Sequence, residues 1–369
     1  MRSKIVIPIF LMVVFSCCPE KSGKPEKSEK SVSDLTLKNY RPRSVYNIPK
    51  TSVEKAAYPV VDMHSHDYAA NEQEIQDWVT TMKKRGIEKT VILSKETGAG
   101  FDSVVEKYAK FPQEFELWCG IDYTGYDTDE NWTENAIKEL VRCYHKGARG
   151  IGELGDKGEG LVYSKPTPAY GLHIDNPDLE PVWAKCAELG MPVNIHVADP
   201  IWMYEPMDST NDGLMNAYDW RIDLTKEGIL DHGELIQTLE NCVRRNPNTR
   251  FIACHFANCC YDLAILGRLF DKYPNLWADN SARYAETAPI PRYVKAFYEK
   301  YQDRIVYGTD MGMDDEMYAV TFRILESEDE HFYETEQFNY HWPLNGFGLP
   351  AEVLRKVYRG NAVQILNRN

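Results

Sequence analysis

The residues of this sequence with the clearest chemical meaning are two histidines, His64 and His66, separated by one residue. They close a short apolar run, Val60-Val61-Asp62-Met63-His64, that is typical of a buried strand. Residues two apart on a strand point to the same side, so both imidazoles face one way. Neutral imidazoles bind zinc and similar divalent metals, and the pair therefore indicates a metal site. Taken alone, the pair is equally compatible with structural or exposed histidines.

Four further ionisable side chains, Glu153, His196, His255 and Asp310, stand at the ends of later apolar runs. If these runs are parallel strands of one barrel, their carboxyl ends meet at one rim and the side chains converge with the histidine pair. Each residue has an ordinary alternative. A lone histidine in an apolar run is often a core residue, Asp310 can cap a helix, and Glu153 can pair with Arg149. Their repeated placement at strand ends favours a site.

The elements that would position these residues are eight apolar runs separated by amphipathic stretches. The runs contain Val60–His64, Thr90–Leu93, Leu117–Ile121, Gly150–Glu153, Pro192–His196, Phe251–His255, Leu276–Asp279 and Ile305–Gly308. The stretches between them carry apolar residues at helical spacing and end at Gly or Pro. Strand followed by helix, eight times over, predicts an α/β fold, a (β/α)8 TIM barrel forming a single domain over residues 55–369. An open doubly wound sheet is the structural alternative.

Three long connections follow the fourth, fifth and eighth predicted strands. They run from Asp156 to Asp178, from Ala198 to His232 and from Met311 to Pro350, the last of them irregular. All three leave the carboxyl ends of strands, where barrel active sites lie. Long ordered loops at such a position are usually functional, so we expect them to surround the site.

The N-terminal residues and the net charge indicate where the chain is located and what it binds. A basic start, an apolar run over Ile5–Phe15 and Cys17 resemble a bacterial lipoprotein signal over residues 1–17. An ordinary secretory signal or an uncleaved anchor is the alternative. Residues 18–50 are polar and predict a flexible tether, which gives a lipid-anchored protein of the cell envelope facing the periplasm or the exterior. The net charge of −14 argues against a nucleic-acid partner.

The motifs resemble those of the amidohydrolase superfamily, within it the amidohydrolase-related (amidohydrolase 2) branch of decarboxylases, lactonases and similar hydrolases. The matching segments, spread over residues 58–366, are Val61-Asp62-Met63-His64-Ser65-His66, Ile195-His196, Cys254-His255, Val306-Tyr307-Gly308-Thr309-Asp310 and Val353–Ala362. The resemblance implies the barrel fold and a divalent metal, most often zinc. It implies as ligands of a single metal His64, His66, His196 and Asp310.

The resemblance leaves open whether one or two metals bind. His255 would match a histidine that hydrogen-bonds or shuttles protons to the reacting centre, or that binds the second metal in two-metal members. In those members a carboxylated lysine or a glutamate on the fourth strand bridges the two metals. This sequence has no lysine at the end of that strand. It has Glu153, in a Gly-Glu-Leu-Gly context that resembles TatD-like deoxyribonucleases.

The expected chemistry follows from the donor set. A metal with three or four protein ligands keeps a position for water and lowers its pKa, and Asp310 is placed to accept the proton. Arg283 would hold a substrate carboxylate or hydroxyl, or else form a surface salt bridge. Trp202, Tyr204 and Trp220 would stack on substrate rings, or else pack the loop.

These residues predict a hydrolase that acts on an ester, lactone or amide of a small, sugar-derived molecule. Three alternatives stay open: a decarboxylase or hydratase of the same superfamily, a TatD-like nuclease, and a ligand-binding lipoprotein without turnover. The expected partners are a small-molecule substrate and, through the lipid anchor, a membrane. The sequence is also compatible with a homo-oligomer.

Overall fold

A computed structural model describes residues 31–165 and 167–367. The predicted signal with Cys17 lies outside the described residues. The chain divides into two compact units after Tyr40. The described part of the first unit contains two short 3-10 helices, Val32–Asp34 and Leu37–Asn39. The second unit, which begins at Arg41, contains the strands and the candidate site.

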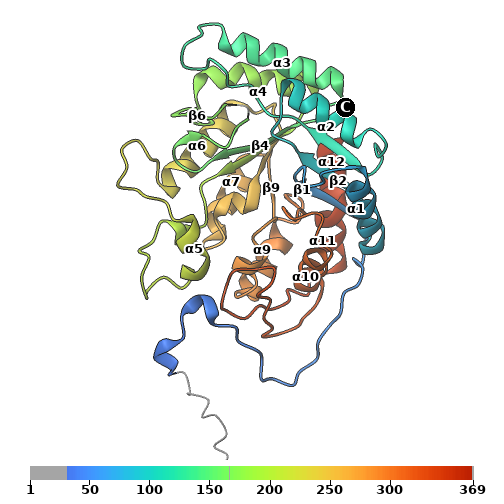
Figure 1. Cartoon of the computed structure of the whole chain (residues 1–369), viewed down its shortest axis with the longest axis vertical. Coiled ribbons are helices and arrows are strands. Elements are labelled where there is room, and N and C mark those ends of the chain that lie inside the picture. The colour runs from blue at the N-terminus through green and yellow to red at the C-terminus, as the bar shows by residue number, and fades with distance from the viewer. Residues whose placement is uncertain (1–30, 166, 368–369) are drawn as a thin grey trace, which may run out of the picture. The chain divides into compact units, whose positions relative to one another are not determined.

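Eight parallel strands form the centre of the second unit (Figure 1), and each contains or overlaps one of the predicted runs. They are β1 (Val60–Ser65), β2 (Ile87–Leu93), β3 (Phe115–Trp118), β4 (Ile151–Asp156), β7 (Val193–Val197), β8 (Phe251–Ala253), β9 (Leu276–Asp279) and β10 (Ile305–Val306). One sheet pairs β1-β2-β3 and the other β4-β7-β8-β9-β10. Backbone hydrogen bonds join them at both seams, from Cys119 to Gly150 (3.0 Å) and from Met63 to Tyr307 (2.9 Å). The strands therefore follow one another around the predicted barrel.

Helices connect successive strands and cover the outside of the barrel. They are α1 (Glu72–Arg85), α2 (Gly98–Tyr108), α3 (Trp132–Lys146), α4 (Glu180–Leu189), α6 (His232–Arg245), α7 (Leu263–Lys272) and α9 (Pro291–Lys300), followed at the end by α11 (Ala351–Arg355), a π turn over Lys356–Gly360 and α12 (Asn361–Leu366). Helix α1 shows why they form here. Asn71 accepts a hydrogen bond from the Glu74 amide at its start, Ile75 and Trp78 are buried on one face, and Gly86 ends it in a left-handed conformation.

The core has two parts, one inside the barrel and one between the strands and the helices. The barrel interior is filled by large side chains such as Met63, Trp118 and Trp277, against which α12 packs Ala362. The Trp118 ring requires a glycine beside it. A Cβ atom on Gly150 would lie 2.3 Å from that ring. A filled barrel leaves the rim at the carboxyl ends of the strands as the place for a site.

The three long connections lie where the sequence predicts them, but they are more structured than expected. The first carries the hairpin of β5 (Gly160–Leu161) and β6 (Ala169–Tyr170) and the second the short helix α5 (Leu214–Trp220). The third is not irregular throughout, because it contains α10 (Asp315–Glu326). Asp314 caps this helix, and its buried residues include Met317 and Leu325. The helical spacing of the apolar residues in this segment was not recognised from the sequence.

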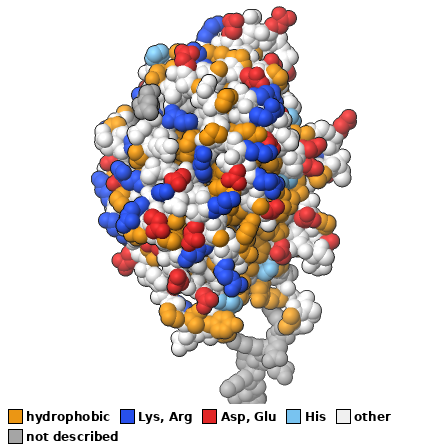
Figure 2. Space-filling view, turned by 180° about the vertical axis from the view of Figure 1, so that it is seen from behind, with side chains coloured by type: hydrophobic (Ala, Val, Ile, Leu, Met, Phe, Trp, Pro, Cys, Tyr) orange, Lys and Arg blue, Asp and Glu red, His pale blue; other side chains and the backbone are white. Residues whose placement is uncertain are grey.

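Residues 41–54 form no helix or strand, yet they contact the barrel unit. Ser44 Oγ lies 3.3 Å from His331 Nδ1, and the Thr51 amide donates to Asp329 (2.8 Å). The compact unit thus begins at Arg41 rather than near residue 55. None of the helices in the described ranges is long and apolar enough to span a bilayer. On the face shown in Figure 2, basic and acidic side chains are interspersed.

Candidate metal centre

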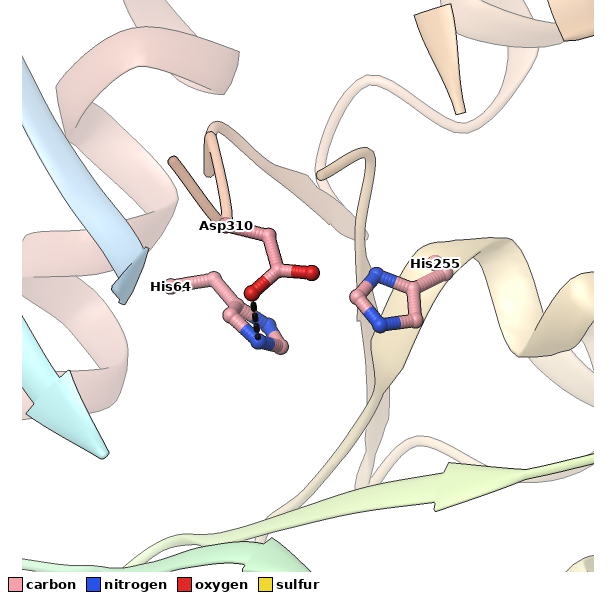
Figure 3. A group of neighbouring side chains, drawn as sticks. All are labelled: His64, His255 and Asp310. Atoms are coloured by element: carbon pink, nitrogen blue, oxygen red, sulfur yellow. Dashed lines mark ion pairs between the residues drawn. The ribbon is translucent and has the colours of Figure 1, made fainter. Parts of the chain in front are cut away.

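One cluster of predicted donors is formed by β1 and the turn after β10. His64 is fully buried, and its Nε2 lies 3.6 Å from Asp310 Oδ1. His66 Nε2 lies 3.0 Å from the same oxygen. Figure 3 shows the Asp310 carboxylate reaching toward the His64 ring, with the His255 ring on its other side. Three donors from distant parts of the sequence therefore converge, as the strand-end pattern predicts.

A second cluster is centred on the Glu153 carboxylate of β4. Glu153 Oε1 lies 2.7 Å from His196 Nδ1 and 3.4 Å from His255 Nε2. The same oxygen lies 3.9 Å from His64 Nε2, and Oε2 lies 3.5 Å from His66 Nε2. Glu153 thus lies between the two clusters. His196 groups with Glu153 and His255 and not with the His64 cluster, so the four-ligand set implied by the resemblance is divided in two.

The backbone turns sharply where the strands deliver these side chains. Five residues at strand ends have φ between 52° and 64°, the left-handed region that non-glycine residues rarely adopt: Lys95, Ala198, His255, Ala282 and Asp310. Such backbone strain clusters at functional sites, where the surrounding structure holds it in place. Close packing continues beside β1, because a Cβ atom on Gly308 would lie 2.7 Å from His64 Cβ.

Outer acceptors fix the orientation of three imidazoles. Each directs Nδ1 to an oxygen behind it: His64 to Asp279 Oδ2 (2.9 Å), His66 to the Leu93 carbonyl (2.8 Å) and His255 to the Ser281 carbonyl (3.0 Å). This arrangement leaves the Nε2 atoms facing the site. His64 Nε2 is buried and has no hydrogen-bond partner among the described residues. An orphaned buried nitrogen with an oriented ring is what a metal ligand requires, so these residues fit a divalent metal.

The electrostatics of the site also favour a bound cation. Burial alone would lower the pKa of His64, but the nearby Asp279 carboxylate outweighs it and raises that pKa to about 9. Burial likewise opposes ionisation of Asp279, but the neighbouring His64 lowers the pKa of Asp279 to about 2. Against the same burial effect, adjacent histidines hold the pKa values of Glu153 and Asp310 below their usual range. The carboxylates are therefore ionised at neutral pH and provide negative charge for a cation.

His255 differs from His64 in its electrostatic surroundings. Burial, helped by the positive charge of Arg283, lowers the pKa of His255 to about 4. His255 is therefore a neutral imidazole at pH 7. Its Nε2 carries a lone pair toward the site, because Nδ1 is directed to Ser281.

Sequence reasoning missed two members of this network. Lys95, just after β2, places Nζ 2.8 Å from Glu153 Oε2. The suggested pairing of Glu153 with Arg149 is wrong, because Arg149 donates to the Tyr144 and Ala148 carbonyls. The second is Asp279, the last residue of β9. Both follow or end predicted strands, so the rule that identified the histidines, applied to Lys and Asp, would have included them.

A cavity of about 390 Å³ opens onto the donors. His196, His255 and Asp310 line one side of it, and Arg283 lines another. The Arg283 guanidinium is 8% exposed and is oriented by a 2.8 Å hydrogen bond from Nε to Asn258 Oδ1. Its Nη1 also lies 3.6 Å from Oε1 of the buried Glu286, so Arg283 forms a buried ion pair rather than a surface one. A buried guanidinium at a cavity wall is suited to bind an anionic group.

The aromatic residues of the loop after β7 take different places. Trp220 lines the cavity, and Lys157 Nζ lies 5.0 Å from its ring centre. Trp202 is not among the lining residues. It donates to Asp212 and packs against Trp342 at 5.7 Å. Tyr204 accepts a hydrogen bond from the Asp199 amide. The structure thus gives Trp202 and Tyr204 the loop-packing role that was the alternative, and it brings Trp220 to the cavity.

Comparison with known proteins gives one family and several similar structures. The Amidohydro_2 family model, described as amidohydrolase, matches residues 61–368. No curated protein sequence matches the chain. Three of the solved structures that resemble it are given below, and at their low sequence identity the likeness shows a shared fold.

The first is an uncharacterised TIM-barrel protein from Bordetella bronchiseptica, with 15% identity, coverage of 84% of this chain and 98% of that one, and a TM-score of 0.53. The second is a dihydroxybenzoic acid decarboxylase from Polaromonas sp. JS666 with bound manganese and 2-nitroresorcinol. It has 16% identity, coverage of 85% of this chain and 98% of that one, and a TM-score of 0.52. The third is a 5-carboxyvanillate decarboxylase from Novosphingobium aromaticivorans complexed with manganese. It has 13% identity, coverage of 86% of this chain and 99% of that one, and a TM-score of 0.51.

Proposed function

The chain belongs to the amidohydrolase family, and from this premise we propose that it is a metal-dependent decarboxylase of a small carboxylic acid. The observation that carries the proposal is the buried Arg283 guanidinium, which shares one cavity with His255 and Asp310. A carboxylate is the group that such a planar fork binds best. The names of two of the similar structures, both decarboxylases with manganese, favour this reaction over the hydrolysis that the sequence suggested first.

The cavity walls support an aromatic or otherwise unsaturated acid. Trp220, Phe338 and Tyr340 line it together with Met203. Flat apolar faces bind planar rings and exclude water from a carbanion-like centre. A sugar-derived substrate stays the alternative, because Asn216, Gln337 and Asn339 line the same cavity and offer amide groups to hydroxyls.

The residues divide the work of decarboxylation. A bound divalent metal would be held by His64, His66 and Asp310 and would supply Lewis acidity toward the substrate oxygens. Arg283 holds the substrate by charge. The bond between carbon and the carboxylate breaks, carbon dioxide leaves, and the carbon keeps the electron pair and takes a proton. We assign delivery of this proton to His255 Nε2, which is unprotonated in the free protein. Binding of the negatively charged substrate raises the pKa of the imidazole, so that Nε2 takes up a proton from water and passes it to the carbon.

The test is a product analysis. The full chain with added Mn²⁺ or Zn²⁺ is given a panel of hydroxylated aryl acids, and released carbon dioxide is measured. We expect release that depends on the metal, with one deuterium on the product carbon in D₂O. Arg283→Met should raise KM far more than it lowers kcat. Metal-dependent cleavage of esters or lactones, without carbon dioxide from any acid, would contradict the proposal.

One observation favours hydrolysis as a second candidate. Glu153 lies between the two donor clusters, as a carboxylate bridging two metals would, and paired metals suit water-mediated displacement. Asp310 would then accept the proton of the attacking water. The same assay, run with lactones, esters and amides, distinguishes the two reactions. A nuclease is disfavoured by the net charge of −14.

The location is a separate proposal. We propose that Cys17 carries a lipid that anchors the enzyme in the bacterial cell envelope, as the motif around this residue suggests. The small-molecule substrate would then be met outside the cytoplasm. Fractionation of cells producing the wild type and Cys17→Ser tests this. We expect the variant to leave the membrane fraction, and equal membrane association of both proteins would contradict the proposal.

A further inference from the structure

Lys95 is the one lysine that touches the donor clusters within the described ranges. Its Nζ lies 2.8 Å from Glu153 Oε2, and its side chain is 24% exposed. The backbone fixes this position. The Lys95 amide donates to the Gly152 carbonyl (3.3 Å), and the Lys95 carbonyl would lie 2.3 Å from a Cβ atom on Gly120. With its φ of 63°, Lys95 is held in a turn that delivers an ammonium group to the centre.

This contact occupies one of the two oxygens of the carboxylate placed to bridge metals. Glu153 Oε1 faces His196 Nδ1 and His255 Nε2, at 2.7 and 3.4 Å. Oε2 faces Lys95. A carboxylate that bridges two ions through both of its oxygens places one oxygen on each ion. A metal ion bound at Oε2 would therefore lie close to the Lys95 ammonium group, and the two positive charges would repel each other.

Charge counting leads to the same result. Four carboxylates contact the imidazole rings of the donor histidines, and three of them are Glu153, Asp310 and Asp279. The fourth, Asp199, lies 3.0 Å from Lys157 and is compensated there. One divalent ion and the Lys95 ammonium balance the three carboxylates. A second divalent ion would add two uncompensated positive charges within a few ångströms of Lys95, where the low local dielectric makes repulsion strong.

We propose that Lys95 takes the place of a second metal ion and sets the centre to a single divalent ion, held on the side of His64, His66 and Asp310. Lys95 acts here through Glu153, as a positioning residue. The inference depends only on metal binding. It is compatible with decarboxylation and with single-metal hydrolysis, and it excludes the two-metal form of hydrolysis.

The experiment counts bound metal, independently of activity. The full chain is saturated with Mn²⁺ alone, freed of excess ion by gel filtration, and analysed by atomic emission and electron paramagnetic resonance. We expect the wild type to hold one ion per chain with the signal of isolated Mn²⁺. Lys95→Met removes the ammonium and keeps the length of the side chain, and it should hold two ions with the signal of a coupled pair.

Two control variants separate the role of Lys95 from charge removal in general. Lys95→Arg keeps the positive charge and should hold one ion. Lys165→Met removes a cation that is paired with Glu96, the residue after Lys95, and that does not contact Glu153. It should also hold one ion. Circular dichroism and thermal melting verify that each variant is folded.

Three outcomes would overturn the proposal. The first is a wild type that holds two ions, which would also be the result if Lys95 were carboxylated and bridged them. The second is a folded Lys95→Met that holds a single ion with unchanged affinity. The third is a Lys165→Met that gains a second ion just as Lys95→Met does. If Lys95→Met does not fold, the stoichiometry and resonance signal of the wild type still decide.

Discussion

The two sides of the cavity are built in different ways. The strand-end wall is fixed by the barrel and by outer acceptors such as Asp279. We define it as the lining residues His196, His255 and Asp310 together with the donors that contact them, His64, His66 and Glu153. The loop wall, defined as Met203, Trp220, Phe338 and Tyr340, belongs to the connections after β7 and β10. Three of its members are buried, but Trp220 is 55% exposed, whereas His64 is fully buried. The difference indicates that the strand-end wall sets the metal chemistry, while the loop wall selects the substrate.

The largest effect should come from the strand-end wall. Asp310→Asn keeps the shape of the side chain and removes the charge that His64 and His66 share. We expect loss of both bound metal and turnover, by more than the roughly 10- to 100-fold typical of outer partners of a metal site. Metal analysis and kcat measure this. Glu316→Gln, on the exposed surface, is the control. Full metal content in Asp310→Asn would show that the barrel rim tolerates loss of this donor.

The second largest effect tests whether the acceptor behind a metal-binding ring contributes to metal affinity. Asp279→Asn keeps a hydrogen-bond acceptor for His64 Nδ1 but removes the charge behind the ring. Metal affinity should fall by roughly 10- to 100-fold, as for other carboxylates behind metal-binding histidines. Competition with a chelator gives the affinity. An affinity equal to that of the wild type would mean that orientation alone, without the charge, is enough.

This contrast also explains what the sequence could reveal. The ends of the strands can be predicted from the sequence, because a buried strand is an apolar run and its last residues face the rim. This predicted the barrel and the placement of Glu153 and His255. It did not reveal that Lys95 meets Glu153, because Lys95 follows β2 and reaches β4 across the intervening β3. The residues of the loop wall were harder to predict, because aromatic residues in a loop do not recur at the regular spacing of a strand or a helix. Trp202 and Trp220 look alike in sequence, and only the fold places Trp220 at the cavity.

A smaller effect compares these two tryptophans of the same loop. Trp220→Ala removes an exposed ring from the cavity lining, and we expect KM to rise about threefold to tenfold with little change in stability, as for loss of a partly exposed aromatic contact. Trp202→Ala should affect stability and not substrate binding, because its ring packs on Trp342 away from the cavity. Its melting temperature should fall while KM stays unchanged. Equal KM changes in both variants would abolish the distinction between lining and packing.

The smallest effect concerns how the loop after β4 is anchored to the strand-end side. The hydrogen bond between His173 Nδ1 and Asp156 Oδ2 (2.7 Å), outweighing partial burial, raises the pKa of His173. Asp156 in turn accepts from the amides of Gly158 and Gly160, so the ion pair ties the loop to β4. A raised pKa means that the folded state binds the proton more tightly. The stabilisation is therefore complete below about pH 6.5, the unfolded value, and is lost as the pH rises through the folded pKa.

His173→Gln should accordingly lower the melting temperature more at pH 5.5 than at pH 8.5. The difference should correspond to about 0.5 kcal/mol, since a partly exposed ion pair contributes little. Thermal unfolding of wild type and variant at both pH values measures it. His145→Gln, a histidine in the last turn of α3 without an acidic partner among the described residues, is the control and should show no such pH dependence. A destabilisation of His173→Gln that is equal at both pH values would show that His173 supports the loop as a neutral hydrogen-bond donor, so that the loop is anchored by geometry rather than by charge.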